Sequence, residues 1–489
     1  MPMTLFNLGP SGICLLAAAF LLIWYLVSAA TSYFRLRHIP APSLLATFSY
    51  LWIARITYSG KQYWIHRGLN DKYGSLVRIG PNQVLTDDSE LVRRINSINS
   101  SYKKSRFYIT GRFDPYHDTV FTIFDPEPHK RARARSAAAY SGRETPGLEV
   151  IIDEHIRTLI DIVRQRYMAT STTRERPLLD LGSISCYFTM DVITHLAFGQ
   201  QKGYLRDETD HFDFLGGVRR LWPQMSTCAD VPWIREVLFA PVAEEYVNSR
   251  FESVEKQQGD MLASLMNRGF DRSECQAEGL LLLFAGTEST ACAIRAILIH
   301  AITSPSVYHR LKLEIRTAVK QSQVSSPITL HEAKNLPYLQ AVIYEGIRQR
   351  PPLLGVWPKV VPSSGDTLHG KYLPPGTEIC TNTSALLRSR VLFGPDADIF
   401  RPERFTEVSA EKKAEMERNV ELAFGYGQWM CAGKNIAMME LNKFVFEVLK
   451  NFDVEIVDPA KPCSVLSYGV FLEEGLRVRV TEAESLDVA

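Results

Sequence analysis

The sequence predicts one large, mainly α-helical domain that follows a single N-terminal transmembrane helix. Its 489 residues are 46% hydrophobic and 22% charged, which suffices to bury a large core. This length would ordinarily suggest about three domains. However, no Gly/Ser-rich or Pro-rich linker divides the chain after residue 60, and a continuous apolar run extends from Gly12 to Ala30. One helical domain behind one anchor is therefore the expected architecture.

The N-terminal apolar run predicts an uncleaved membrane anchor. About 19 residues in a helix span about 29 Å, close to the thickness of the hydrocarbon core of a bilayer. Arg35 and Arg37 follow the run, and the positive-inside rule places that flank in the cytosol. A cleaved signal peptide is the alternative. The segment before the run has no Lys or Arg, and the run is longer than a usual signal core, which favours the anchor.

Charge and cysteine spacing exclude several classes of protein. The net charge of +1 gives no electrostatic reason to expect nucleic-acid binding. No Cys-x-x-Cys pair occurs, which argues against a zinc site and against a disulfide framework, and fits a reducing compartment. The eight cysteines are scattered along the chain, at positions 14, 186, 228, 275, 292, 380, 431 and 463.

One cysteine stands in a glycine-containing loop directly before an apolar helix. The segment from Phe424 to Gly433 reads FGYGQWMCAG, and the helix is expected to begin near Lys434. Backbone N–H groups and a helix N-terminus favour the Cys431 thiolate and should lower its pKa. Gly427 and Gly433 permit backbone angles and close approaches that a Cβ would forbid. A lone cysteine is more often a small buried hydrophobe, but this setting suits a soft thiolate ligand to iron.

This loop resembles the haem-binding signature of the cytochrome P-450 superfamily, Phe-x-x-Gly-x-x-x-Cys-x-Gly, with all four fixed positions filled. The resemblance implies that Cys431 is the metal ligand of haem b, and that Phe424, Gly427 and Gly433 belong to the haem-binding loop. It also implies the P-450 fold, an α-rich triangular prism with small β-sheets. Residues 1–32 are then the anchor, 33–60 a basic, proline-containing hinge, and 61–489 the haem-thiolate catalytic domain.

Three further residues are expected to bind the haem propionates. His129 and Arg133 follow Pro126 and Pro128, which look like a helix start, and their spacing of four puts them on one helical face. On these residues alone, a solvated basic helix is the alternative. Their spacing matches the family's Trp/His-x-x-x-Arg pair that binds propionates. Lys359 stands where the family often has an arginine, and it keeps the charge without the bidentate fork.

A long apolar helix is expected from about residue 274 to residue 303, and it contains a second motif. The segment AGTEST, from Ala285, resembles the family's Ala/Gly-Gly-x-Asp/Glu-Thr oxygen-activation motif. The resemblance implies that Gly286 leaves space for dioxygen and that Glu288 and Ser289 are catalytic, Glu288 by helping to deliver protons. A close helix-packing site at Gly286 is the alternative, because an interior glycine costs about 1 kcal/mol relative to alanine and needs a reason.

Glu345, Arg348 and Arg404 are expected to form a structural network. Glu-x-x-Arg alone is a weak signal, usually a surface pair worth a few tenths of a kcal/mol. Here it is followed by Pro-Glu-Arg-Phe, which contains Arg404, as in the family's core element. The resemblance implies that the three side chains lock the core beneath the haem loop.

Two positions depart from the family pattern. Ser289 replaces the usual threonine and loses the β-branch that fixes χ1, which implies a looser proton relay. Trp429 stands where most members have an arginine or histidine for a propionate, so His129, Arg133 and Lys359 are expected to carry that role. Loops with Gly-x-Trp/Tyr-x-Cys are similar to those of some fungal members, which by analogy implies secondary metabolism.

The resemblance implies a monooxygenase that hydroxylates or otherwise oxidises a lipophilic small molecule with O2 and NADPH-derived electrons. The implied partners are NADPH-cytochrome P-450 reductase, with cytochrome b5 as a further electron donor, and membrane lipid, in the endoplasmic reticulum membrane with a cytosolic catalytic domain. A reductase-independent haem-thiolate isomerase or dehydratase and a non-catalytic membrane haem protein are the alternatives. The expected walls of the substrate site are Phe107, Tyr108, Phe113, Leu282, Leu283, Phe284 and residues 353–356 and 468–471.

Overall fold

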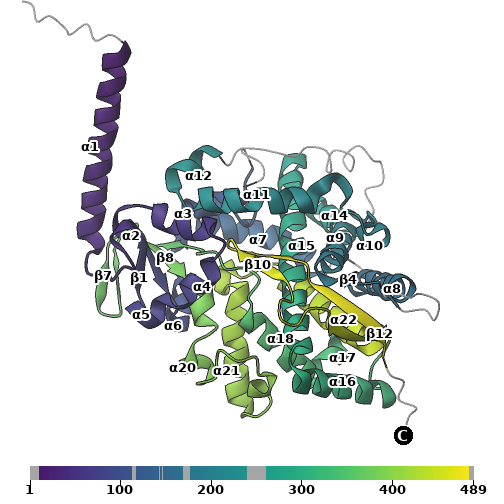
Figure 1. Ribbon diagram of the computed structural model, residues 1–489. Helices are drawn as coiled ribbons and strands as arrows, with labels where there is room; N and C mark the ends of the chain where they lie inside the picture. Colours follow the sequence, from purple (N-terminus) through teal and green to yellow (C-terminus); the bar gives the residue numbers. More distant parts are fainter. Residues whose placement is uncertain are drawn as a thin grey trace, which may run out of the picture.

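A computed structural model describes residues 10–112, 117–142, 144–145, 147–168, 177–238 and 260–483. Helices make up most of the body, and small β-sheets lie beside them (Figure 1). The first helix projects away from this body. The predicted mainly helical fold with small sheets is confirmed.

The projecting helix is α1 (Pro10–Leu36), and it is longer than the apolar run that predicts it. Its segment Gly12–Leu36 has a mean hydropathy of 2.4 and is almost entirely exposed, as a membrane anchor requires. The second helix apolar enough to cross a membrane, Arg272–Ile302, is mostly buried in the body. Arg78 holds the end of α1 to the body, because its guanidinium donates to the carbonyl oxygens of Ser32 (3.0 Å) and Thr47 (2.8 Å).

A five-stranded sheet forms the lobe nearest to α1. Its order is β1-β2-β8-β5-β3, with β2 and β8 parallel and the other pairs antiparallel. The register pairs Lys104 with Lys359, so two lysines from distant parts of the chain lie side by side. The strands are β1 (Val77–Gly80), β2 (Gln83–Thr86), β3 (Lys103–Lys104), β5 (Lys359–Val360) and β8 (Glu378–Thr381). The helices of this part are α2 (Leu44–Phe48), α3 (Leu51–Tyr58), α4 (Gln62–Arg67), α5 (Leu69–Tyr73), α6 (Ser89–Asn96) and η1 (Arg106–Gly111).

The centre of the body is the long helix α15 (Arg272–Ile302), close to its predicted range of 274 to 303. Asp271 and Glu274 form a capping box at its start, which satisfies backbone N–H groups that lack helical partners. The main hydrophobic core packs α15 against α9 (Leu181–Phe198), α18 (Pro337–Gln349) and α22 (Lys434–Asn451). The other helices around them are α7 (Pro126–Ser141), α8 (Leu148–Arg166), α10 (Tyr204–Asp207), α11 (Phe214–Ala229), α12 (Pro232–Leu238), α14 (Met261–Asn267), α16 (Pro305–Lys320), α17 (Leu330–Lys334), α19 (Thr383–Leu386), α20 (Arg390–Phe393) and α21 (Ala410–Val420).

Three smaller sheets complete the fold. The hairpin of β10 (Ser464–Ser467) and β11 (Phe471–Glu474) lies across the body in front of α15 (Figure 1). The strands β4 (Leu179–Asp180), β12 (Arg477–Glu482) and β9 (Phe452–Ile456) form a sheet in that order, and β6 (Asp366–Leu368) pairs with β7 (Lys371–Leu373).

The predicted network of Glu345, Arg348 and Arg404 is present and fully buried. Arg348 forms a bidentate pair with Glu345, with distances of 2.7 and 2.8 Å. Arg404, in η3 (Pro402–Phe405), donates to the same carboxylate at 3.0 Å. One buried carboxylate thus serves two arginines, whose remaining N–H groups donate mainly to backbone carbonyls of residues 387–399.

Candidate functional site

The loop that carries Cys431 lies between η5 (Gly427–Trp429) and α22. The N–H of Cys431 donates to the carbonyl oxygen of Phe424 at 2.7 Å, which closes the loop. Gly427 has φ +58°, and a Cβ there would collide with the carbonyl oxygen of Asn96, so glycine is required. Gly433 differs from the expectation, because its φ is −86° and a Cβ would meet no protein atom within 4 Å. The space beside Gly433 is open.

Cys431 is exposed at the surface of its loop, although protein atoms around the sulfur desolvate the thiolate. This burial raises the pKa of Cys431, whereas the N–H groups of Gly433 and Lys434 and the charge of Arg133 lower it. The N–H groups therefore act as predicted, but the predicted net fall in pKa is wrong for the protein alone, because desolvation of the thiolate is the larger effect. A bound cation would reverse this balance.

Cationic and aromatic side chains gather around Trp429, in the same loop. The ring of His129 lies 4.3 Å from the indole ring. The Nζ atoms of Lys104 and Lys359 lie 4.7 and 5.9 Å from the centre of the indole. The indole Nε1 is buried and has no hydrogen-bond partner. A buried N–H without a partner is uncommon, and it can donate a hydrogen bond to a bound ligand.

Three separate elements position these cations. Strands β3 and β5 pair Lys104 with Lys359, and α7 presents His129 and Arg133 one turn apart. Arg133 Nη1 donates to the carbonyl oxygen of Met430 at 2.6 Å, which fixes α7 against the cysteine loop. The structure therefore brings the three residues predicted to bind propionates, His129, Arg133 and Lys359, together with the loop of Cys431 and adds Lys104.

In the part of the chain that the structure describes, the basic side chains of this cluster are buried or half-buried without ion-paired carboxylates, and their pKa values are lowered. Burial, assisted by the neighbouring cations, lowers the pKa of His129 to about 3. Burial lowers the pKa of Lys359 to about 7, and burial together with Lys359 and Arg133 lowers the pKa of Lys104 well below its usual value. Across the described ranges, none of Lys104, Arg133 and Lys359 forms an ion pair with a carboxylate of the protein. Unpaired buried cations are costly, so the cluster is suited to a ligand with carboxylates.

Lys104 is the residue of this cluster that the sequence analysis missed. Two lysines precede the aromatic segment of η1, and Lys103 is exposed whereas Lys104 is buried. Lys104 Nζ donates to the carbonyl oxygens of Val120 (3.2 Å) and Phe121 (2.8 Å). The signal in the sequence is a lysine three positions before the aromatic pair Phe107 and Tyr108, but only the pairing of β3 with β5 shows which lysine points inward.

The middle of α15 has one open face. Ala285 is exposed and Ser289 is half-buried, one turn apart, although most of the helix around them is buried. Ser289 Oγ donates to the carbonyl oxygen of Ala285 at 2.6 Å. Thr290 is buried, so Ser289 supplies the hydroxyl on the open face. The predicted serine therefore lies on the open face of α15, beside Ala285.

Gly286 is required for packing. A Cβ built on it would lie 2.8 Å from Cγ1 and 2.9 Å from Cδ1 of Ile193 in α9, closer than real contacts allow. The structure supports the close-packing alternative. The Cα of Gly286 faces Ile193 of α9, whereas the open face of α15 lies at Ala285 and Ser289. The sequence could not separate the two explanations, because they differ only in the direction of a missing side chain.

We expect Gly286→Ala to lower the free energy of unfolding by about 1–3 kcal/mol, because overpacking outweighs the gain of about 1 kcal/mol in helix propensity. In an Ile193→Ala background the same change should be neutral or stabilising. Thermal unfolding of the two single variants and the double variant measures this coupling. An equal loss of stability in both backgrounds would contradict the assignment of Gly286 to packing.

Glu288 lies beside Ser289 and is held by other side chains. Its Oε1 accepts from Arg295 Nη2 at 2.5 Å, and its Oε2 accepts from Cys186 Sγ at 3.1 Å. Burial acts to raise the pKa of Glu288, but Arg295 and Arg219 outweigh burial and hold its pKa below the usual value. The carboxylate is therefore ionised at neutral pH.

The predicted walls of the substrate site divide into two groups. Phe107 and Tyr108 form an aromatic cluster with Phe121 and Trp357, with ring centres 5.2–6.3 Å apart. Other predicted wall residues, Leu282, Leu283, Leu354, Val356 and Phe471, are buried in the hydrophobic cores. Phe113 lies outside the described residues.

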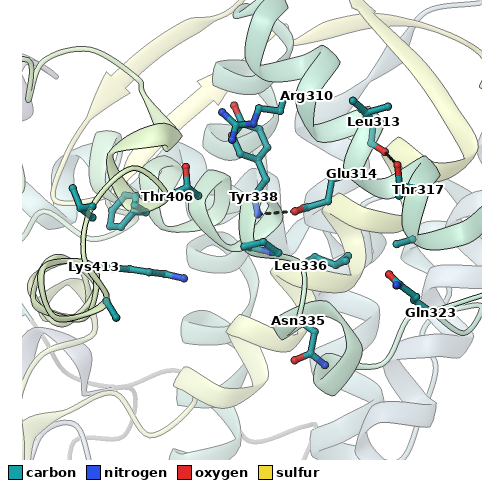
Figure 2. A pocket seen from close by; sticks show the side chains of 15 residues that line it. Arg310, Leu313, Glu314, Thr317, Gln323, Asn335, Leu336, Tyr338, Thr406 and Lys413 are labelled. Carbon is teal, nitrogen blue, oxygen red and sulfur yellow. Dashed lines mark hydrogen bonds between the residues drawn. The ribbon is translucent and has the colours of Figure 1, made fainter. Parts of the chain in front are cut away.

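A separate surface hollow lies between α16, α18, η3 and α21 (Figure 2). Glu314 accepts the N–H of Tyr338 at 2.9 Å, so this carboxylate caps the start of α18. The hollow contains none of the predicted site residues, and Leu313, Leu336 and Phe405 supply its apolar surface. We assign it no role in the chemistry of Cys431.

Comparison with known proteins agrees with this geometry. Residues 40–476 match the family model for cytochrome P450. The chain is similar to "Cytochrome P450 monooxygenase abl1" of Leptosphaeria maculans (58% identity over 483 residues, 94% of this chain and 85% of the relative). It is also similar to "Cytochrome P450 monooxygenase aba1" of Botryotinia fuckeliana (56% over 473 residues, 92% and 93%) and to "Cytochrome P450 monooxygenase ABA1" of Pyricularia oryzae (36% over 500 residues, 96% and 96%). The chain belongs to the cytochrome P450 family and is a cytochrome P450 monooxygenase.

Proposed function

We propose that this monooxygenase binds haem b through Cys431 and hydroxylates or otherwise oxidises a lipophilic small molecule, with O2 and electrons from NADPH. The observation that supports this most directly is the cluster beside the cysteine loop. A thiol, three buried or half-buried cations without carboxylate partners, and the unpaired N–H of Trp429 all meet there. Among the described residues, no carboxylate pairs with these cations, and no acceptor meets Trp429 Nε1.

The residues present fit the two propionates and the iron of a haem. Lys104 and Lys359 supply two ammonium groups and Arg133 a guanidinium, while Trp429 Nε1 and the neutral ring of His129 supply uncharged donors. Together these groups can neutralise and orient two carboxylates. The open space beside Gly433 leaves room for a flat group next to the sulfur. Trp429 therefore takes part in the cradle as a hydrogen-bond donor, although it lacks the charge that most members have at this position.

Each proposed residue has a definite task in the reaction. A thiolate-ligated haem activates dioxygen so that one oxygen atom is inserted into the substrate. Cys431 supplies the thiolate, and Phe424 and Gly427 hold the loop that directs it. The Oγ–H of Ser289 can rotate away from the carbonyl of Ala285 to donate at the open face of α15. Glu288, one residue earlier, supplies the carboxylate that returns a proton to this face.

We propose a fungal secondary metabolite of terpenoid, polyketide or alkaloid type as the substrate. The similar proteins of Leptosphaeria maculans, Botryotinia fuckeliana and Pyricularia oryzae support a fungal setting. The aromatic cluster of Phe107, Tyr108 and Trp357 is apolar, which suits a lipophilic molecule.

We also propose that the protein is a single-pass protein of the endoplasmic reticulum membrane with a cytosolic catalytic domain. Residues 1–32 form the anchor, 33–60 the hinge and 61–489 the catalytic domain, and NADPH-cytochrome P-450 reductase supplies the electrons, with cytochrome b5 as a further donor. The exposed apolar surface of α1 and the basic residues at its end support this topology.

Lys359→Met should increase the rate of haem loss by at least about tenfold, which corresponds to about 1.4 kcal/mol. Burial lowers the pKa of Lys359 to about 7 in the haem-free protein, and a propionate should raise it. Haem binding then takes up a proton, so the affinity of the wild type should fall as pH rises above about 7, and this dependence should be absent in Lys359→Met. Haem transfer to apomyoglobin across this pH range measures both effects.

Lys61→Met is the matched control, because Lys61 is an exposed lysine outside the cluster. It should lose haem at the wild-type rate. An unchanged rate and an unchanged pH dependence in Lys359→Met would show that Lys359 does not contact the bound group.

Expression with a reductase, feeding of lipophilic fungal precursors, and mass spectrometry test the proposed reaction. The expected result is an NADPH-dependent product heavier than its precursor by one oxygen atom. An isomer or a dehydrated product formed without NADPH would instead identify a reductase-independent haem-thiolate enzyme. Full haem binding without any product from the panel would favour a non-catalytic haem protein.

A further inference from the structure

Five charged side chains form a continuous chain from the β10–β11 hairpin to the open face of α15. Arg295 stands at its centre. Its Nε donates to Glu473 Oε2 and its Nη2 to Glu288 Oε1, each at 2.5 Å. Arg350 also pairs with Glu473, and Arg219 lies 3.8 Å from Glu288. Positive and negative groups therefore alternate, and each carboxylate lies between two guanidinium groups.

The centre of this chain is buried. The side chain of Arg295 is 0% exposed and that of Glu473 is 1% exposed. Burial of an ion pair is weak evidence for a gain in stability, because well-packed apolar side chains would serve as well or better. A role in positioning Glu288 accounts for the pair more directly, since Glu288 stands next to the hydroxyl of Ser289.

Glu288 has no free oxygen in this arrangement. Arg295 binds one carboxylate oxygen, and the thiol of Cys186 and the more distant Arg219 face the other. These three groups, from α15, α9 and α11, are the titratable or charged neighbours that bind or pair with Glu288. A carboxylate held in this way stays ionised, and it can accept and pass on a proton only when the bond to Arg295 loosens.

The hairpin that carries Glu473 also contains residues 468–471, which are predicted to line the substrate site. The carbonyl oxygen of Tyr468 accepts from Trp222 Nε1 of α11 at 3.0 Å. The carbonyl oxygen of Gly469 accepts from the N–H of Leu354 at 2.7 Å. Because β10 and β11 are paired, a shift of this turn would also move Glu473. Arg295 would then move with Glu473, to which it donates a hydrogen bond.

We propose that Arg295 and Glu473 are positioning residues for Glu288, and that they couple the place of the β10–β11 hairpin to proton supply at Ser289. This inference rests on the proposed function, because it assumes that Glu288 serves the proton path. Arg295 divides its N–H groups between two carboxylates. Loss of one carboxylate strengthens its hold on the other, and movement of the hairpin changes how tightly Glu288 is held.

Glu473→Gln tests the proposal, with Glu474→Gln as control. Glu474 is the next residue on β11 and is exposed. The full-length protein is placed in phosphatidylcholine nanodiscs with a reductase, without substrate. NADPH oxidation is then measured against pH in H2O and in D2O. Glu473→Gln should shift the pH profile downward by about one unit, a tenfold change in proton concentration, because removal of a neighbouring carboxylate favours ionised Glu288. Its solvent isotope effect should also rise.

The remaining variants and spectra decide between the outcomes. Glu474→Gln should match the wild type, and Glu473→Asp should restore part of the wild-type profile. Arg295→Lys, which keeps the charge but loses the fork, should shift the profile to higher pH. If Glu473→Gln does not retain haem, the pH profile of Arg295→Lys tests the proposal in its place. Unchanged profiles in variants with a normal thiolate spectrum with carbon monoxide would overturn this inference. Absence of that spectrum in the wild type would overturn the proposed function instead.

Discussion

Cys431→Ala is expected to abolish oxygenation completely. The side chain of Cys431 supplies the sulfur in the loop between η5 and α22, and no other cysteine belongs to the cysteine loop from Phe424 to Gly433. Alanine cannot ligate iron, so the electron donation that favours O–O cleavage is lost. Product formation with the reductase and the amount of bound haem are both measured. The cationic cluster should let the variant retain part of its haem, in a form without a thiolate.

Cys228→Ala is the control for this experiment. Cys228 is a half-buried cysteine in α11, and its replacement should leave haem content and oxygenation near wild-type levels. Oxygenation by Cys431→Ala at more than a trace would show that another group ligates the iron. The account of the cysteine loop would then be wrong.

Glu345→Gln is expected to lower the free energy of unfolding by about 3–5 kcal/mol, the range for removal of one partner of a buried ion pair. Glu345 is fully buried and binds both Arg348 and Arg404. The glutamine variant leaves Arg348 without a carboxylate partner and Arg404 with Asp396 alone. Urea unfolding monitored by circular dichroism gives the change in stability. Haem should be lost earlier in the transition than in the wild type.

Glu407→Gln provides the comparison for Glu345→Gln. Glu407 pairs with Arg401 at 3.2 Å near the same segment, but both side chains are exposed. A surface pair of this kind contributes about 1 kcal/mol or less. Similar losses in the two variants would show that the buried network has no special role in holding the core.

The sequence predicted the parts of the fold that depend on local patterns. The apolar run with Glu274 near its start and Pro305 beyond its end predicted α15 to within two residues. The Glu345, Arg348 and Arg404 network was predicted from two motifs, with Glu345 and Arg404 59 positions apart in the chain, and the structure brings them together. Motif spacing therefore predicts contacts correctly when the residues lie on one helix or in two motifs that occur together in the family.

The sequence failed where the answer depended on contacts between distant elements. Lys104 joins the cationic cluster only because β3 pairs with β5. Gly286 packs directly against Ile193 of α9, where a Cβ would collide. No pattern within α15 could show this contact. The pKa of Cys431 rises because of the protein that surrounds the sulfur, and local N–H groups gave only the smaller, opposite effect.

The end of the anchor helix shows the same limit. The apolar run predicted a helix to Ala30, whereas α1 continues to Leu36. Buried Arg78 from β1 donates to the carbonyl oxygens of Ser32 and Thr47, and Arg35 donates to that of Pro375. These bonds tie the end of α1 to α2, to β1 and to the turn at Pro375. They come from residues 46 and 340 positions away in the chain, beyond any local signal.

The carbon monoxide difference spectrum of the reduced, full-length protein decides whether Cys431 ligates a haem whose carboxylates are held by Lys104, Arg133, Lys359 and Trp429. We expect the strongly red-shifted Soret band of thiolate-ligated haem in the wild type, and its absence in Cys431→Ala. A wild-type protein that binds haem but shows the carbon monoxide spectrum of a histidine-ligated haem would contradict it.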